Sequence, residues 1–173
     1  MNALSDPRAS DYLNENFVAT YLKVGTFAIV NGNKVGGNVA SYFCLTDGTV
    51  IHAVPGQVSP DKLMEEARWA YETRKAARTR SINPTTGLVD FRRYSEHMRT
   101  AHVERYHAEK DGRGQVNPRQ KLAIPASMPR AGTQAQAHWL LASQPMAKLD
   151  DVYPIVWTQI LREQLSNLPV ARR

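Results

Sequence analysis

The chain has 173 residues and a mass of 19.4 kDa, which suits one domain or a domain with a helical extension. Hydrophobic residues make up 42% and charged residues 22% of it, so a disordered or fibrous chain is excluded. No apolar run reaches the roughly 18 residues that indicate a membrane span, and no signal peptide is visible at the start. The single cysteine excludes an internal disulfide and a cysteine-rich metal site.

The beginning of the chain predicts a short helix, a strand and a loop. Ser5-Asp6-Pro7 favours a helix start, because short oxygen-bearing side chains cap free N–H groups and proline is tolerated in the first turn. This helix should reach about Asn14. Residues 17–24 are rich in β-branched and aromatic side chains and predict a strand. Residues 31–38 are rich in glycine and asparagine, which is typical of a loop.

The clearest local signal is a β-hairpin. Two apolar runs, 39–45 and 49–54, flank Asp47-Gly48, a pair that favours a tight two-residue turn. Ser59 and Pro60 then open a helix that should run to about Ala77, with the serine as its cap.

The second half of the chain predicts helices separated by a linker. A helix is expected from Leu88 to about Lys110, and residues 111–133 are polar and contain prolines that discourage regular structure. Two short helices, about 134–143 and 151–165, should close the chain. We place one module at 1–80 and a helical extension at 81–173. One face of the helix at 88–110 carries apolar residues at helical spacing: Leu88, Phe91, Tyr94, Met98 and Ala101.

The positive charge is concentrated in the middle of the chain. The formal net charge is +6, and residues 61–130 carry 15 lysines and arginines against 9 acidic residues, so the rest of the chain is balanced. Such clustering attracts nucleic acid or acidic partners. The alternative interpretation, which the interleaved acidic residues favour, is a solvated helix end with cations at its negative terminus. The candidate residues for an anionic partner are Arg74, Lys75, Arg78, Arg80, Arg92 and Arg93.

Three segments of the first half carry a family resemblance. The chain reads LNENFV at 13–18 and FCLTDGTVI at 43–51, followed by VPG at 54–56. Together with the order helix, strand, loop, hairpin, helix, these segments resemble the distal part of the thioredoxin-like superfamily. The resemblance covers about residues 1–80. It implies an α/β (α+β) fold, namely a partial or variant thioredoxin-like sheet with a β-hairpin and flanking helices, to which C-terminal helices are added.

The chain departs from the redox-active members of that superfamily. Their Cys-x-x-Cys would lie upstream of Met1, and the region where they place a cis-proline reads GGNV at 36–39. Thiol–disulfide exchange requires an attacking thiolate and a resolving thiol. Cys44 is the one redox candidate, and in a predicted apolar strand it is interpreted as a small buried hydrophobe. We therefore expect a redox-inactive chain.

The histidines do not form a recognisable ligand motif. His97, His102 and His107 are spaced five residues apart, so each is rotated by about 140° from the last on a helix. They cannot share a face as the i, i+4 pair of a zinc-binding helix does. No Gly-x-Ser-x-Gly elbow and no phosphate-loop ending is present. We expect no metal site, no cofactor and no catalytic constellation.

Three functional hypotheses follow. The first is a non-catalytic thioredoxin-like module for protein interaction or assembly, with strand addition at a sheet edge as one mode of binding. The second is a fragment of a thiol–disulfide oxidoreductase whose Cys-x-x-Cys lies upstream of Met1. The third is a basic nucleic-acid-binding module. No membrane partner is expected, and the cytoplasm is the default compartment, or the periplasm if an N-terminal region has been lost.

Overall fold

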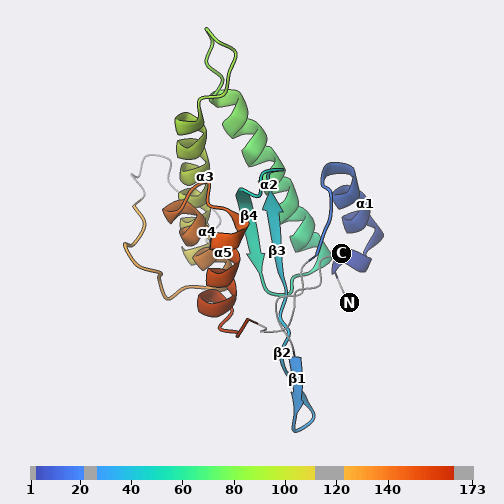
Figure 1. The fold of residues 1–173 in the computed structure, drawn as a ribbon. Coiled ribbons are helices and arrows are strands. Elements are labelled where there is room, and N and C mark those ends of the chain that lie inside the picture. Colours follow the sequence, from blue (N-terminus) through green and yellow to red (C-terminus); the bar gives the residue numbers. More distant parts are fainter. Residues whose placement is uncertain (1–2, 22–26, 112–122, 166–173) are drawn as a thin grey trace.

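A computed structural model describes residues 3–21, 27–111 and 123–165 and shows a mixed α+β fold (Figure 1). A 3₁₀ turn, η1 (Ala3–Ser5), precedes α1 (Pro7–Asn16). Two antiparallel hairpins follow, β1 (Phe27–Val30) with β2 (Asn33–Gly36) and β3 (Ala40–Cys44) with β4 (Val50–Pro55). The remaining elements are helical: α2 (Pro60–Arg80), α3 (Phe91–Asp111), α4 (Thr133–Ser143), α5 (Leu149–Ile155) and the π-helical turn η2 (Val156–Ile160).

The starts of α2 and α3 are set by capping side chains. Ser59 accepts a hydrogen bond from the N–H of Lys62 at 3.2 Å, which confirms the predicted start of α2. Helix α3 begins at Phe91, later than the expected Leu88, because the Asp90 carboxylate accepts hydrogen bonds from the first free N–H groups of the helix.

The prediction of a strand was wrong for residues 17–21, and so was that of a loop throughout residues 31–38. Residues 17–21 form no strand, and residues 22–24 lie outside the described part of the chain. Composition alone does not make a strand, because a strand needs a neighbour that pairs with its N–H and C=O groups. Residues 31–38 contain strand β2 in place of a continuous loop. Asn31 and Gly32 form the turn of the β1–β2 hairpin and have φ values of 51° and 78°, as a tight hairpin turn requires.

The β3–β4 hairpin is confirmed, but its turn has three residues, 46–48. The N–H of Gly48 donates to the carbonyl of Leu45 at 3.0 Å, and the N–H of Leu45 donates to the carbonyl of Thr49 at 2.8 Å. Gly48 has a φ of 81°, a conformation that glycine adopts without steric penalty. A three-residue loop with a left-handed glycine is also a common hairpin connection. The Asp47-Gly48 pair therefore predicted the position of the turn correctly, but the turn has one residue more than the two that were predicted.

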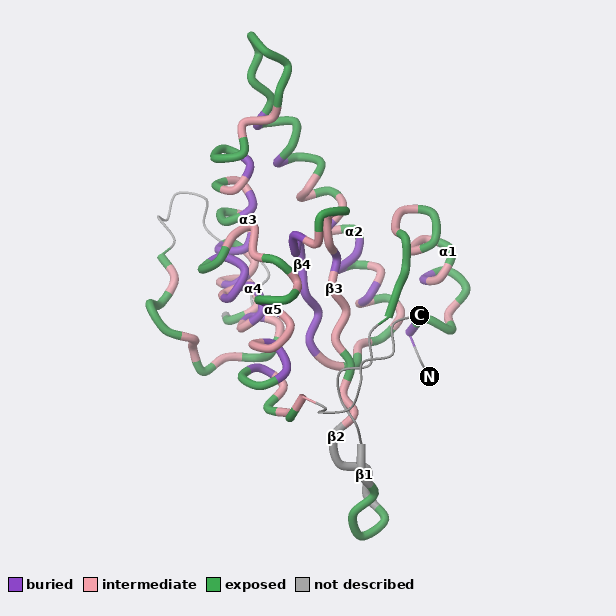
Figure 2. Tube along the Cα trace, viewed as in Figure 1, coloured by how far each residue is buried: buried purple, intermediate pink, exposed green. Residues whose placement is uncertain are grey.

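Strand β4 lies in the interior, with α2 and α4 packed against it (Figure 2). All of its residues are buried, which explains why the strand is an almost continuous apolar run. One apolar cluster joins the hairpin to α2 and α3 and includes Phe43, Ile51, Val54, Leu63, Ala67, Ala70, Tyr94 and Met98. A second joins the hairpin to α4, α5 and η2 and includes Val50, Ala53, Leu140, Leu141, Val152, Val156 and Ile160.

Two expectations for the helical half need correction. Leu88 and Phe91 are 71% and 73% exposed, because they lie beyond the core at the connection between α2 and α3. The last helical segment ends at Ile160 rather than near residue 165. Its final turn is wide, since the N–H of Leu161 donates to the carbonyl of Val156.

Within the described residues, no helix has the length and apolar character needed to cross a membrane.

Candidate metal centre

Three histidines from three elements meet in the interior. His52 lies in β4, His102 in α3 and His138 in α4, and these residues are 0%, 2% and 0% exposed. One nitrogen of each ring lies within 4.8 Å of the others. The ring centroids are 4.9 to 6.1 Å apart. We call these three residues the histidine cluster.

Helical spacing places two of the three rings in the core. Tyr94, Met98, His102 and Tyr106 follow one another at intervals of four residues and are all buried, so they form the inner face of α3. His138 is buried on α4, the helix with the most extensive packing against α3. His52 belongs to the completely buried strand between these helices and α2.

Two of the rings each have one nitrogen held by a protein acceptor. His102 Nε2 donates to the carbonyl of Ile51 at 2.9 Å. His52 Nε2 lies 2.8 Å from a carboxylate oxygen of Glu66 and donates to it. Metal-binding histidines typically donate their second N–H to a carbonyl or a carboxylate, which fixes the orientation of the ring and its tautomer. Both contacts are of this kind.

These contacts determine where the protons lie inside the cluster. Because a carbonyl only accepts, His102 carries its proton on Nε2 and its Nδ1 is an acceptor. His138 Nδ1, 2.9 Å from His102 Nδ1, is therefore the donor of that bond. His138 Nε2 then accepts from the side-chain amide of Gln134 at 3.4 Å. His52 Nδ1 is buried and has no hydrogen-bond partner among the described residues.

Burial keeps the histidine cluster neutral. Removal from water, and next the repulsion that a protonated His52 would exert, lowers the pKa of His102 to about 3. Burial also lowers the pKa of His138 well below its ordinary value. The pKa of His52 is lowered by burial even though the neighbouring Glu66 opposes the shift. Neutral imidazole is the form that binds a metal ion, because its lone pair is free.

A buried carboxylate supports the cluster from the α2 side. Glu66 is 0% exposed and accepts from Lys62 at 2.8 Å and from Arg105 at 2.9 Å, in addition to His52. Burial alone would raise the pKa of Glu66. The hydrogen bonds and positive charges of its neighbours more than offset this and hold the pKa well below its usual value. The ionised carboxylate is thus paired rather than left alone in the core, which would be costly.

An aromatic ring covers the cluster. The ring centroid of Trp69 lies 4.8 Å, 5.2 Å and 5.1 Å from those of His52, His138 and His102. The guanidinium of Arg105 lies 5.6 Å from the centre of the Trp69 ring. An apolar wall of this kind limits the access of water to the imidazoles and strengthens electrostatic interactions inside.

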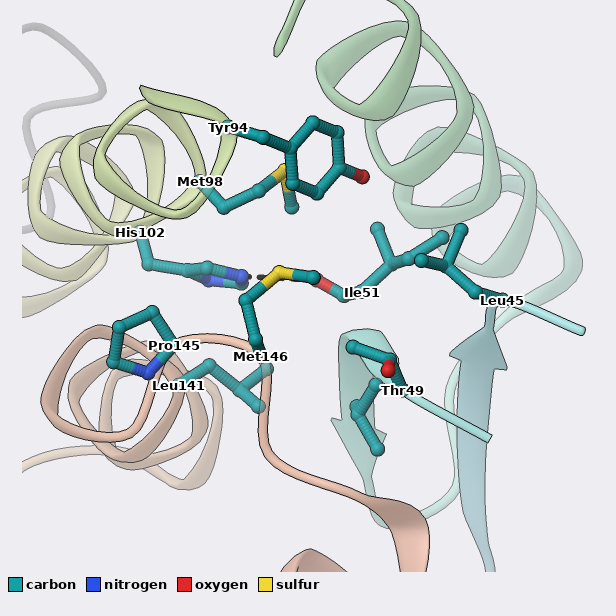
Figure 3. A pocket seen from close by; sticks show the side chains of 10 residues that line it. Leu45, Thr49, Ile51, Tyr94, Met98, His102, Leu141, Pro145 and Met146 are labelled. Carbon is teal, nitrogen blue, oxygen red and sulfur yellow. Dashed lines mark hydrogen bonds between the residues drawn. The ribbon is translucent and has the colours of Figure 1, made fainter. Parts of the chain in front are cut away.

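A small cavity adjoins the cluster at His102 (Figure 3). Its volume is about 10 Å³, close to that of a single water molecule. Figure 3 shows Tyr94 and Met98 extending from α3 and Met146 approaching from the segment after α4. Tyr94 Oη is buried and has no hydrogen-bond partner among the described residues.

The residues singled out from the sequence lie elsewhere. Cys44 is half-buried in β3, and burial raises the pKa of its thiol to about 11, so the thiol is protonated at neutral pH and a weak nucleophile. The six basic candidates are brought together, because α2 and α3 form an antiparallel hairpin closed by a bridge between Ile82 and Val89 (Figure 1). Five of them are exposed and Arg74 is half-buried.

The histidine spacing excluded a motif within one helix but missed the cluster. His97 and His107 do not join His102 in it, in agreement with their predicted rotation around α3. His52 and His138, which the sequence did not group with His102, come from β4 and α4. One signal was present in the sequence, since His52 interrupts an otherwise apolar strand and a polar side chain there must find a buried partner.

Comparisons of the chain with models of protein families, with curated proteins and with solved structures find no match. The resemblance to the thioredoxin-like superfamily stays a prediction, as do the three functional hypotheses that accompany it. The arrangement of the chain's own residues therefore carries the functional argument.

Proposed function

We propose that this chain is a metal-binding domain in which His52, His102 and His138 bind one divalent transition-metal ion. The observation that carries the proposal is the convergence of three buried, neutral imidazoles from three elements, with nitrogens within 4.8 Å of one another. Imidazole suits several such metals. Zn²⁺ is the expected ion, because it has no geometric preference of its own and tolerates the angles that a fold imposes.

Binding would require the three rings to reorient, because the nitrogens now lie up to 4.8 Å apart and the rings of His52 and His138 are stacked. Two nitrogens about 2.0–2.1 Å from a tetrahedral Zn²⁺ lie about 3.3 Å apart. The 2.9 Å distance between the Nδ1 atoms of His102 and His138 would therefore open slightly. The proton on His138 Nδ1 would leave or move to Nε2, where the amide of Gln134 can rotate to accept it. The unpartnered lone pair of His52 Nδ1 would gain a partner.

The ion would act on the fold, because it would tie β4, α3 and α4 together. A ligand that binds only the folded state stabilises it by about 2.7 kcal/mol when its free concentration is a hundred times the dissociation constant. The surrounding residues have matching roles. Glu66 and the Ile51 carbonyl would orient two of the rings, and Trp69 would exclude water.

The test is a metal titration of the chelator-treated protein. Co²⁺ should give the visible absorption bands of a tetrahedral site at one equivalent per chain, and Zn²⁺ should displace it and raise the melting temperature. His52→Asn and His138→Gln should each weaken binding by at least about tenfold. His97→Ala, on the same helix as His102 but outside the cluster, is the matched control and should bind like the original chain.

The contrary result is equally clear. If Co²⁺ shows only the spectrum of the hydrated ion and Zn²⁺ leaves the melting temperature unchanged, the histidine cluster is a buried hydrogen-bond network and the proposal fails. A response that His97→Ala abolishes and His52→Asn leaves intact would place the metal elsewhere.

A further inference from the structure

The connection between α2 and α3 combines exposed apolar side chains with a high density of cations. We call residues 74–93 the hairpin tip. It projects from the body of the molecule at the end of the two long helices (Figure 1). Ile82, Leu88 and Phe91 are 42%, 71% and 73% exposed. Large apolar side chains that are exposed within one short, positively charged segment are candidates for an interaction site.

The charge of the hairpin tip is strongly one-sided. It contains six lysines and arginines and one acidic residue, Asp90, which pairs with Arg93 at 3.6 Å. Within the described part of the chain, the other cations of the tip form no ion pair; they are Arg74, Lys75, Arg78, Arg80 and Arg92. No ion pair among the described residues therefore neutralises these cations.

Helix dipoles do not explain all of these cations. Arg78 and Arg80 lie in the last turn of α2, where a positive charge is favourable. Arg92 and Arg93 lie in the first turn of α3, at the positive end of that helix, where a cation is unfavourable. The carboxylate of Asp90 at this helix end offsets part of the repulsion, and an external anion that contacts the tip would offset more of it.

The hairpin tip is preformed. The side chain of Asn83 accepts hydrogen bonds from the N–H groups of Thr85 and Thr86 at 2.8 and 3.3 Å. The N–H of Asp90 donates to the carbonyl of Ser81 at 2.8 Å, which closes the loop at its base. A surface that is ordered before binding loses less conformational entropy when it meets a partner.

We infer that the hairpin tip docks on an anionic phospholipid surface, with its cations facing the phosphates and Leu88 and Phe91 entering the interface. The charge complementarity and the apolar side chains together favour this partner. An anionic lipid surface offers negative headgroups and an apolar layer beneath them. A nucleic acid offers the negative charge but no apolar layer for Leu88. Docking of this kind needs no membrane-spanning helix.

The test is sedimentation of the full chain with vesicles of phosphatidylcholine alone or mixed with phosphatidylglycerol. We expect binding only when phosphatidylglycerol is present. We also expect binding to weaken at least about tenfold when NaCl is raised from about 0.05 M to about 0.5 M, because salt screens the attraction. Metal-saturated and chelator-treated protein should bind alike, so this result is separate from that of the metal titration.

Two double variants separate the contribution of the apolar side chains to vesicle binding from that of the cations. Leu88→Ser with Phe91→Ser should weaken partition by about tenfold or more while all charges remain. Arg78→Gln with Arg80→Gln should do the same while the apolar side chains remain. The matched controls are Val18→Ser, an exposed apolar residue outside the tip, and Lys110→Gln with Arg130→Gln, two exposed cations outside it. The controls should bind like the original chain.

Three outcomes would overturn the inference. They are equal binding to both kinds of vesicle, no binding to either, and binding that the controls reduce as much as the tip variants. A duplex DNA oligonucleotide should be tested in parallel. If the protein bound the DNA but not the vesicles, and Arg78→Gln with Arg80→Gln abolished DNA binding, the cations would be assigned to nucleic acid. Because these side chains are exposed, circular dichroism should show the same fold in every variant.

Discussion

His102 and His138 are joined by a hydrogen bond of 2.9 Å between their Nδ1 atoms, and both residues are buried, with 2% and 0% of their surface exposed. Such a bond exists only while one nitrogen donates and the other accepts, so it breaks when both nitrogens carry a proton. The two residues belong to α3 and α4. The packing of these helices is therefore linked to the protonation of the histidine cluster.

The first prediction concerns pH. Burial lowers the pKa of His102 from 6.5 to about 3, and lowers those of His52 and His138 in the same direction. The unfolded chain therefore binds more protons between these values, and folding stability is present above pH 6.5 and falls as the pH drops towards 3. Urea unfolding of chelator-treated protein should show a slope of at most about 1.4 kcal/mol per pH unit for each buried histidine.

The control for the pH profile is His97→Ala, which removes a histidine of α3 from outside the cluster and should leave the profile unchanged. A free energy of unfolding that stays constant between pH 7 and pH 4 would contradict the prediction. It would mean that the three imidazoles are already charged in the folded chain or that water reaches them.

The second prediction concerns the buried carboxylate. Glu66→Gln keeps the shape of the side chain but leaves Lys62 and Arg105 without their buried anion. We expect a loss of about 3 kcal/mol in the free energy of unfolding, because removing one partner of a buried charge network strands the others. The measurement is urea denaturation followed by tryptophan fluorescence.

Glu65 offers a matched control for this change. It is adjacent in sequence and contacts the same two cations at 3.2 and 3.4 Å, but its side chain is 53% exposed. Glu65→Gln should cost less than about 0.5 kcal/mol, since exposed ion pairs contribute little. Equal losses for the two variants would show that burial does not distinguish these carboxylates.

The third prediction concerns the thiol. Burial raises the pKa of Cys44 from 9.0 to about 11, so the thiolate fraction at pH 8 should be about a hundredfold lower than in the unfolded chain. Labelling with iodoacetamide should be correspondingly slower in buffer than in urea. Rapid labelling of the folded protein would show that Cys44 is accessible and would revive it as a redox candidate.

The fourth prediction concerns the cavity beside His102. Tyr94 Oη is buried without a partner, so Tyr94→Phe removes no hydrogen bond between described residues. The free energy of unfolding should stay within about 0.5 kcal/mol of the original value or rise. A loss of more than about 1 kcal/mol would show that the hydroxyl binds a water molecule in the cavity.

The local elements could largely be predicted from sequence, because their signals lie within a few residues. The hydroxyl of Ser59 caps a helix three residues later, and Gly48 tolerates a conformation that a hairpin turn demands. The predicted strand is not present at residues 17–21, because β-branched composition does not provide a neighbouring strand. Leu88 and Phe91 have the right spacing for a core face, but nothing packs against them at the hairpin tip.

The amino-acid sequence by itself determined the mixed α+β class, the β3–β4 hairpin, the start of α2 and the excess of positive charge in the middle of the chain. Tertiary structure alone decided that His52, His102 and His138, and not the three histidines of one helix, come together. The physical reason is that helical and strand periods specify which face of an element a residue occupies. Which faces then meet depends on packing between segments far apart in the chain.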